Sequence, residues 1–270
     1  MNRTNPQAAG AVVQVEHLQC RYGSEVILQD ISFSVQHQEI FFVAGRSGCG
    51  KTTLLRHLLG LLSPFQGRIA YFGRDFTGAS PIERHELARS FGMLFQNSAL
   101  WSSMSLAENV SLPLVLHTSL PRRVRAEIVA LKLAQVGLAG CQNRFPRDLS
   151  GGMRKRAALA RALALDPAIL FFDEPTAGLD PISANQIDHL IVQVRDTLGT
   201  TVLVVSHSLS SIFHIADRMI LLDPQAKGII ATGAPLELKR GNADPHVREF
   251  LEQTPPEGTG APAQGRSSLN

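Results

Sequence analysis

Short apolar runs alternate with helical patterns along most of the chain. Residues 12–18 alternate between apolar and polar positions, which predicts a strand with one buried face. Residues 40–44 are apolar throughout, which is typical of a fully buried strand. Residues 52–62 carry leucines at helical spacing, so we expect an amphipathic helix there. The mixture predicts an α/β domain.

Further apolar runs extend this pattern toward the C-terminus. Three of them predict buried strands, and two short runs late in the chain predict a hairpin around residues 223–227. The strands are expected at residues 91–95, 169–172 and 201–205, and the hairpin at residues 218–222 and 228–231.

The stretch from about residue 100 to 165 has a different pattern, because its strong signals are helical only. Residues 124–136 and 154–165 are the clearest examples. We therefore expect a helical insertion within one α/β domain that spans residues 11–252. The flanking segments, residues 1–10 and 253–270, are rich in Pro, Gly, Ser, Thr and Ala, and we expect disordered tails there.

Four of the expected strands end in polar or glycine-rich residues. These are Gly45, Gln96, the pair Asp173–Glu174, and the pair Ser206–His207. Ligands of parallel α/β sheets bind beyond the carboxyl ends of the strands. If the four strands share one sheet, these groups meet at a single site.

The strongest local motif is the segment 45–52, which reads GRSGCGKT and fits the pattern GxxxxGK[ST]. It follows an expected strand and opens an expected helix, as a phosphate-binding loop requires. Glycines let backbone N–H groups close around phosphate oxygens, and the helix N-terminus adds partial positive charge. Lys51 would bridge the β- and γ-phosphates, and the Thr52 hydroxyl would bind Mg²⁺. A chance glycine-rich turn is the alternative.

Two adjacent carboxylates follow the apolar run at residues 169–172. Asp173 would hold Mg²⁺, and Glu174 is placed to orient or deprotonate an attacking water. An ordinary acidic turn that begins at Pro175 would give the same local pattern. The phosphate-loop motif favours the catalytic interpretation.

A third motif, LSGGM at residues 149–153, precedes an expected helix. Ser150 is a good N-cap, and two glycines expose backbone donors. Arg154, Lys155 and Arg156 would then lie in the first turn, where cations oppose the helix dipole. A nearby anion would offset that cost. A capped surface helix with a solvated basic turn is the plainer interpretation.

The composition excludes several classes of protein. Apolar residues make up 44 % of the chain and charged residues 18 %, against about 25 % charged in an average soluble chain, so partners are expected to cover part of the surface. The net charge of +3 is too small for a protein that wraps DNA, and no nucleic-acid partner is expected. Three scattered cysteines without a CxxC pair argue against a zinc site or a disulfide framework. No apolar run approaches the roughly 20 residues of a membrane span, and no signal peptide is expected.

Taken together, the motifs resemble those of the nucleotide-binding subunits of ATP-binding cassette (ABC) transporters, in order, over about residues 12–250. One motif could be accidental, but six in this order could not. The matching segments are the phosphate loop (45–53), the Q-loop glutamine Gln96, the signature (149–153), the Walker B strand and glutamate (169–174), the D-loop (177–180) and the switch histidine His207, while Tyr22 matches the aromatic residue that stacks on adenine.

The resemblance implies a P-loop NTPase fold, with a RecA-like core sheet, an antiparallel β subdomain and an inserted helical subdomain. It implies ATP and Mg²⁺ as ligands, Glu174, His207 and Gln96 as catalytic residues, and Thr52, Gln96 and Asp173 around the metal. The expected nucleotide-binding residues are Tyr22, Gly45, Arg46, Ser47, Gly48, Cys49, Gly50, Lys51, Thr52 and Thr53.

The resemblance also implies a head-to-tail homodimer that sandwiches two ATP molecules. Ser150, Gly151 and Gly152 would contact the γ-phosphate of ATP held by the partner subunit, and that phosphate would be the anion near the basic helix turn. Asp180 would shape the dimer interface, although an N-cap role before residues 182–194 fits equally well. Closure on ATP and release on hydrolysis would move a separate integral membrane permease.

A narrower resemblance concerns the signature and the Q-loop region. Met153 ends the signature where most of the family has glutamine, and residues 92–114 read GMLFQNSALWSSMSLAENVSLPL. Both segments are similar to the ATPases of bacterial maintenance-of-lipid-asymmetry systems, which work with MCE-domain lipid-binding proteins. The resemblance implies phospholipid transport and a peripheral position on the cytoplasmic face of the inner membrane. The alternatives are an ABC ATPase that energises transport of another substrate, or a non-transport ABC ATPase.

Two further departures from the family pattern affect the expected site. Cys49 stands in the phosphate loop where serine or alanine is common. Ser208 follows His207 where aspartate is frequent, which leaves the orientation of the histidine open.

Overall fold

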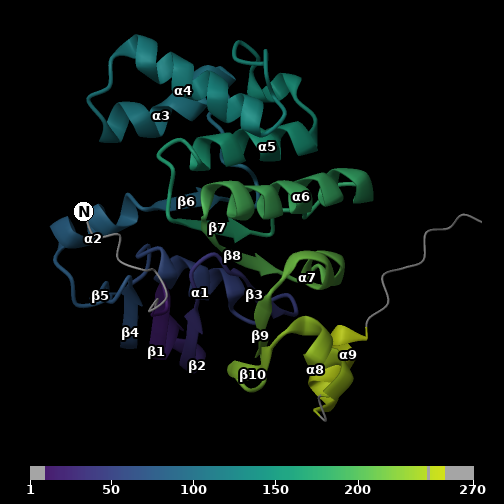
Figure 1. Ribbon diagram of the computed structural model, residues 1–270. Coiled ribbons are helices and arrows are strands. Elements are labelled where there is room, and N and C mark those ends of the chain that lie inside the picture. The colour runs from purple at the N-terminus through teal and green to yellow at the C-terminus, as the bar shows by residue number, and fades with distance from the viewer. Residues whose placement is uncertain (1–9, 242–243, 253–270) are drawn as a thin grey trace, which may run out of the picture.

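Two β-sheets form the framework of the computed structural model, which describes residues 10–241 and 244–252 (Figure 1). Apart from Gly10, the two expected tails lie outside the described residues. The expected strands and the late hairpin are all present, and the α/β fold class is confirmed.

The larger sheet has six strands in the order β10-β9-β3-β8-β7-β6. The strands from β9 to β6 run parallel to one another, and β10 pairs with β9 in an antiparallel hairpin. The strands are β3 (Ile40–Gly45), β6 (Phe91–Leu94), β7 (Ile169–Asp173), β8 (Thr201–Ser206), β9 (Arg218–Asp223) and β10 (Gly228–Gly233).

The smaller sheet has four antiparallel strands in the order β2-β1-β4-β5. It lies below the larger sheet in the view of Figure 1, with α1 beside it. The strands are β1 (Val13–Tyr22), β2 (Glu25–Val35), β4 (Gln66–Tyr71) and β5 (Arg74–Asp75).

The helices cover both sides of the larger sheet, and α3, α4 and α5 form a separate layer beyond α6 (Figure 1). They are α1 (Lys51–Leu58), α2 (Pro81–Ala88), α3 (Leu106–His117), α4 (Arg122–Gln135), α5 (Gly151–Ala162), α6 (Pro181–Leu198), α7 (Leu209–Ile215), α8 (Pro235–Gly241) and α9 (Pro245–Leu251), with a short 3₁₀ turn at Pro146–Asp148.

Helix α1 is shorter than the leucine pattern predicts, because it ends at Leu58 instead of continuing to residue 62. Gly60 has a left-handed backbone with φ of +71°, and its N–H donates to the carbonyl of His57. A glycine in this conformation terminates a helix at little steric cost.

The central strands are buried on both faces, which explains their uninterrupted apolar sequences. Phe42 and Phe172 pack on the side of the sheet that faces the helical layer. Their neighbours Phe41 and Phe171 pack on the opposite side, against the smaller sheet and α1. Because the core is filled on both faces, the strand ends that carry the polar residues are held rigidly.

Within the described ranges, no helix combines the length and apolar character that crossing a bilayer requires.

Candidate active site

The carboxyl ends of four neighbouring parallel strands meet at one cavity of about 370 Å³. The strands are β3, β8, β7 and β6, so the convergence expected from the sequence is confirmed. The cavity is lined by Ile27, Ser47, Gly48, Gly50, Lys51, Thr52, Thr53, Gln96, Glu174 and His207.

The loop between β3 and α1 wraps one side of this cavity. The Lys51 ammonium donates to the carbonyls of Gly45 and Arg46, at 2.8 and 3.0 Å, so its own loop holds it. Gly50, the N-cap of α1, has φ of +99°, a conformation that favours glycine. Gly45 is needed for space, since a Cβ there would lie 2.5 Å from the sulfur of Cys49. Burial raises the pKa of the Cys49 thiol, which packs as a small apolar group.

Asp173 and Glu174 lie at the end of β7, and both are largely buried. The Thr52 hydroxyl approaches the Asp173 carboxylate at 3.5 Å, which joins the start of α1 to this strand. Burial raises the pKa of Asp173, and the neighbouring carboxylate of Glu174 raises it further. A cation between Thr52 and Asp173 would therefore stabilise the ionised carboxylate.

Glu174 has a left-handed backbone with φ of +48°. Its N–H donates to the Val205 carbonyl at 2.9 Å, and its carboxylate accepts from the Ser206 hydroxyl at 3.2 Å. The other carboxylate oxygen lies 2.8 Å from His207 Nδ1. Non-glycine residues in this conformation are uncommon and cluster at functional sites.

Comparison with known proteins identifies the family. An ABC transporter family profile matches residues 28–177. The chain belongs to the ABC transporter ATP-binding family. The resemblance drawn from the motifs is thereby confirmed, and this ABC protein is an ATP-binding ATPase whose core is the P-loop cassette fold.

Two kinds of curated relative match almost the whole ABC domain. The chain is 40 % identical over 241 residues to the intermembrane phospholipid transport system ATP-binding protein MlaF of Haemophilus influenzae, covering 89 % of this chain and 90 % of that one. It is 39 % identical over 242 residues to the probable ribonucleotide transport ATP-binding protein mkl of Mycobacterium tuberculosis, covering 90 % of this chain and 67 % of that one.

Solved structures of cassettes match the fold closely. The structure of cbiO1 from Clostridium perfringens, part of the cbiONQ ABC transporter complex, gives a TM-score of 0.78 at 28 % identity, over 84 % of this chain and 90 % of that one. The dimeric cassette MJ0796 bound to ADP and Pi gives 0.74 at 26 % identity, over 82 % of this chain and 98 % of that one.

Several expected site residues of the ABC protein lie outside the cavity lining. Tyr22 is exposed at the end of β1. The Arg46 guanidinium forms an exposed ion pair with Glu249 of α9 at 2.5 Å. Ser150 is the N-cap of α5 and accepts from the Met153 N–H at 3.2 Å.

The D-loop residue Asp180 has the N-cap role that its sequence context allows. Its carboxylate accepts from the N–H groups of Ile182 and Ser183, at 3.1 and 3.0 Å, at the start of α6. Hydrogen bonds from Ser183 lower the pKa of this carboxyl group. A role at a dimer interface stays a prediction.

The expected basic turn after the signature needs a correction. Helix α5 begins at Gly151, so Arg154, Lys155 and Arg156 follow its first three residues instead of opening it. Lys155 points into the protein and donates to the carbonyls of Gln96 and Glu174. Arg154 donates to the Leu149 carbonyl. The three side chains therefore do not form one basic surface for an external anion.

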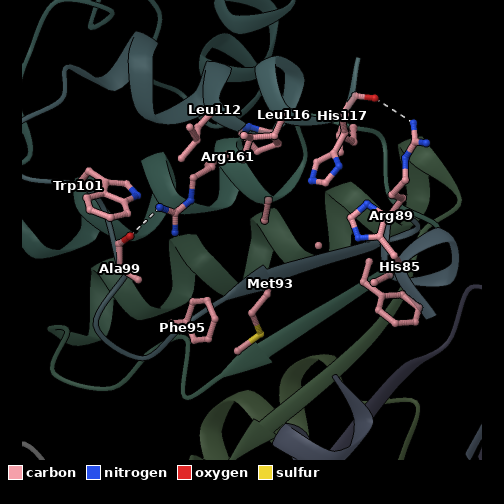
Figure 2. Close-up of a pocket in the computed structure, with 16 residues that line it drawn as sticks. His85, Arg89, Met93, Phe95, Ala99, Trp101, Leu112, Leu116, His117 and Arg161 are labelled. Carbon is pink, nitrogen blue, oxygen red and sulfur yellow. Dashed lines mark hydrogen bonds between the residues drawn. The ribbon is translucent and has the colours of Figure 1, made fainter. Parts of the chain in front are cut away.

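A second, larger cavity lies next to the Q-loop and was not expected from the sequence. It measures about 580 Å³ and lies between α2, α3, β6 and the C-terminal end of α5 (Figure 2). The exposed aromatic side chains of Phe95 and Trp101 line it. The large apolar residues close to Gln96 in the sequence were the signal that could have indicated this cavity. Their exposure, however, depends on how α3 and β6 pack, which the sequence does not show.

Proposed function

We propose that this chain is the ATP-hydrolysing subunit of a transporter that moves phospholipid through a separate membrane permease. The observation that carries the proposal is the position of the Q-loop between two cavities. Gln96 lines the active-site cavity, while the adjacent Phe95 and nearby Ala99 line the larger apolar cavity. A change in the position of Gln96 at the nucleotide would therefore shift Phe95 and Ala99 in the wall of the larger cavity.

The chemistry assigned to the active site is hydrolysis of the γ-phosphate. Lys51, already turned inward on its loop carbonyls, would exchange these contacts for the β- and γ-phosphate oxygens. Glu174 would accept a proton from the attacking water. His207 lies within hydrogen-bond reach of that carboxylate and would hold the water or the γ-phosphate. The backbone of Gly45–Thr53 and Tyr22 would bind the rest of the nucleotide.

Mg²⁺ fits the residues at the end of β7. The Thr52 hydroxyl and the Asp173 carboxylate are hard oxygen donors 3.5 Å apart, and Thr52 and Gln96 both line the active-site cavity. Burial and the neighbouring Glu174 carboxylate raise the pKa of Asp173, and a bound cation would oppose that shift. When bound, the ion would neutralise phosphate charge during transfer.

A homodimer is proposed for the ATP-bound state. ABC cassettes act as dimers with membrane permease partners, and the cassette MJ0796 was solved as a dimer. Ser150, Gly151 and Gly152 lie at the N-terminus of α5, where Ser150 is exposed and backbone donors can approach a phosphate held by the partner. Asp180 would lie at the same interface.

The larger cavity is the proposed docking groove for a helix of the permease. Leu112 and Leu116 of α3 face Met93 and Phe95 across it (Figure 2). Exposed apolar patches of this kind mark protein interaction sites. Covering the groove would also explain why the chain has fewer charges than average.

A charge placed in the groove is expected to release the chain from membranes. Leu116, 67 % exposed, lines the groove, and burying a leucine is worth about 1.5–3 kcal/mol. Leu116→Glu should therefore lower permease affinity at least about tenfold. Leu131→Glu is the matched control, because Leu131 is 56 % exposed on α4 and does not line the groove. Retention of both variants on membranes, measured by sedimentation, would contradict the docking site.

The lipid substrate is proposed from the relatives. MlaF of Haemophilus influenzae is named as part of a phospholipid transport system, and the match covers nine-tenths of both chains. The mkl relatives are named for ribonucleotide transport, but the match covers only two-thirds of their length. We therefore favour phospholipid, an MCE-domain lipid-binding protein as a further partner, and a peripheral position at the cytoplasmic face of the inner membrane.

The substrate assignment is tested on the intact complex. A tagged chain is extracted from membranes of its source organism in mild detergent, and co-purifying proteins and lipids are analysed by mass spectrometry. We expect an integral membrane protein without nucleotide-binding motifs, together with phospholipid enriched over a parallel purification of Leu116→Glu. ATP hydrolysis stimulated by ribonucleotides other than ATP, and not by phospholipid, would favour the other candidate.

A further inference from the structure

Lys155 is a buried cation that the ATPase chemistry described above does not use. It is 5 % exposed, and its ammonium lies 2.5 Å from the Gln96 carbonyl oxygen and 3.2 Å from the Glu174 carbonyl oxygen. Burial lowers its pKa, while the carboxylates of Asp173 and Glu174 oppose that shift. An ammonium is expensive to bury, so its hydrogen bonds to two loops of the active site need a reason.

The two acceptors of Lys155 are backbone groups, so the side chains of Gln96 and Glu174 stay available at the cavity. Gln96 follows β6 and Glu174 follows β7, and these strands are paired. Lys155 thus fixes the peptides on which both side chains are mounted. Glu174 has a left-handed backbone conformation that is strained for a non-glycine residue, and the hydrogen bond from Lys155 helps to hold it.

Lys155 stands on the helix that begins with the signature. Ser150 caps α5, and Lys155 follows five residues later on the same rigid element. A Cβ added at Gly151 would lie 3.3 Å from Leu179, and one added at Gly152 would lie 3.4 Å from Ser183, so the start of α5 lies beside the D-loop and α6. Lys155 therefore lies on the same helix as the signature residues that are proposed to meet ATP of the partner subunit.

A second cation of α5 contacts the Q-loop at a different place. Arg161 donates to the carbonyls of Ser98 and Ala99, at 3.0 and 2.6 Å, on the side of the Q-loop that borders the apolar groove (Figure 2). Arg161 thus holds the groove side of the loop, through two carbonyls that lie beyond Gln96 in the chain. Lys155 is the one of these two α5 cations that joins the Q-loop to the catalytic glutamate.

We propose that Lys155 is a positioning residue that couples the two ATP sites of the dimer. When the signature of one subunit engages ATP held by the partner, Lys155 sets the Gln96 and Glu174 peptides of its own subunit for hydrolysis. The inference rests on the proposed head-to-tail dimer. It predicts that loss of the Lys155 contacts weakens the dependence of hydrolysis at one site on ATP at the other.

The test uses the full-length chain in the complex with its membrane partner. We expect Lys155→Met to lower kcat at least tenfold, to leave ATP binding unchanged, and to lower the Hill coefficient for ATP from above 1 to 1. Lys155→Gln keeps a side-chain N–H donor and should recover much of kcat and cooperativity. The readouts are steady-state ATP hydrolysis, binding of a fluorescent ATP analogue, and thermal melting.

The matched control is Lys132→Met. Lys132 is also buried, 2 % exposed, and its ammonium pairs with the Asp166 carboxylate, away from the nucleotide cavity. It should lower the melting temperature without changing the Hill coefficient. A Lys155→Met complex with unchanged kcat and Hill coefficient would overturn the role of Lys155. The role would also be overturned if Lys155→Met lowered the melting temperature and ATP affinity together with kcat, and Lys155→Gln restored none of them. If the complex without any substitution did not hydrolyse ATP, the proposed function and this inference would both be wrong.

Discussion

Replacing Glu174 with glutamine is expected to lower kcat for ATP hydrolysis about 10²- to 10⁴-fold, the usual contribution of a general base. The amide keeps the size of the side chain and one oxygen, which lies 2.8 Å from His207 Nδ1 or 3.2 Å from the Ser206 hydroxyl. It cannot accept the proton of the attacking water. ATP binding should persist, so the closed dimer should accumulate.

Three measurements on this variant separate catalysis from binding. Steady-state phosphate release gives kcat, equilibrium binding gives ATP affinity, and size-exclusion chromatography with ATP detects the dimer. Glu86→Gln is a suitable control, because Glu86 lies on α2, away from the active-site cavity, and pairs with Arg74 at 3.7 Å on the surface. Normal turnover by Glu174→Gln would contradict the proposed role of Glu174.

The larger sheet could be predicted strand by strand because its central strands are covered on both faces. Burial on both faces requires apolar residues at every position, as in β3, β7 and β8, and such runs stand out in the sequence. The polar groups at the ends of these strands were then placed correctly at one edge of the sheet.

In the smaller sheet, the residue pattern predicted only the strand at residues 12–18, which is part of β1, while the antiparallel sheet itself was expected from the family resemblance and β2 was not recognised. The pairing of β1 with β2 shifts register near Leu18 and Cys20. Each shift interrupts the alternation of buried and exposed side chains. The burial pattern of β2 is accordingly irregular, and no simple period identifies it.

Within the site, the motif residues could be predicted because phosphate binding depends on a short, local loop. The role of Lys155 could not, since three consecutive basic residues fit a solvated helix turn equally well. Its inward direction follows from the packing of α5 against β6, which joins segments about 60 residues apart. The apolar groove could not be predicted either, because it forms between α2, α3, β6 and α5, which are distant in the sequence.

Removal of the Lys51 side chain is expected to abolish most ATP binding. Its ammonium is largely buried and already lies within the phosphate loop, 2.8 Å from the Gly45 carbonyl oxygen. A hydrogen bond to a charged group contributes about 1.5–3 kcal/mol, so Lys51→Ala should weaken ATP binding by about one to two orders of magnitude. Titration with a fluorescent ATP analogue measures this loss directly.

The loss must be distinguished from a disordered loop, because Lys51→Ala also leaves the Gly45 and Arg46 carbonyls without their donor. Lys51→Met also removes that donor but fills the space of the side chain, so it should weaken ATP binding to the same extent while the melting temperature stays closer to that of the unaltered chain. Lys239→Ala, on the exposed face of α8, controls for the loss of a positive charge. If Lys51→Met bound ATP with undiminished affinity, the phosphates would have to lie elsewhere than on the loop between β3 and α1.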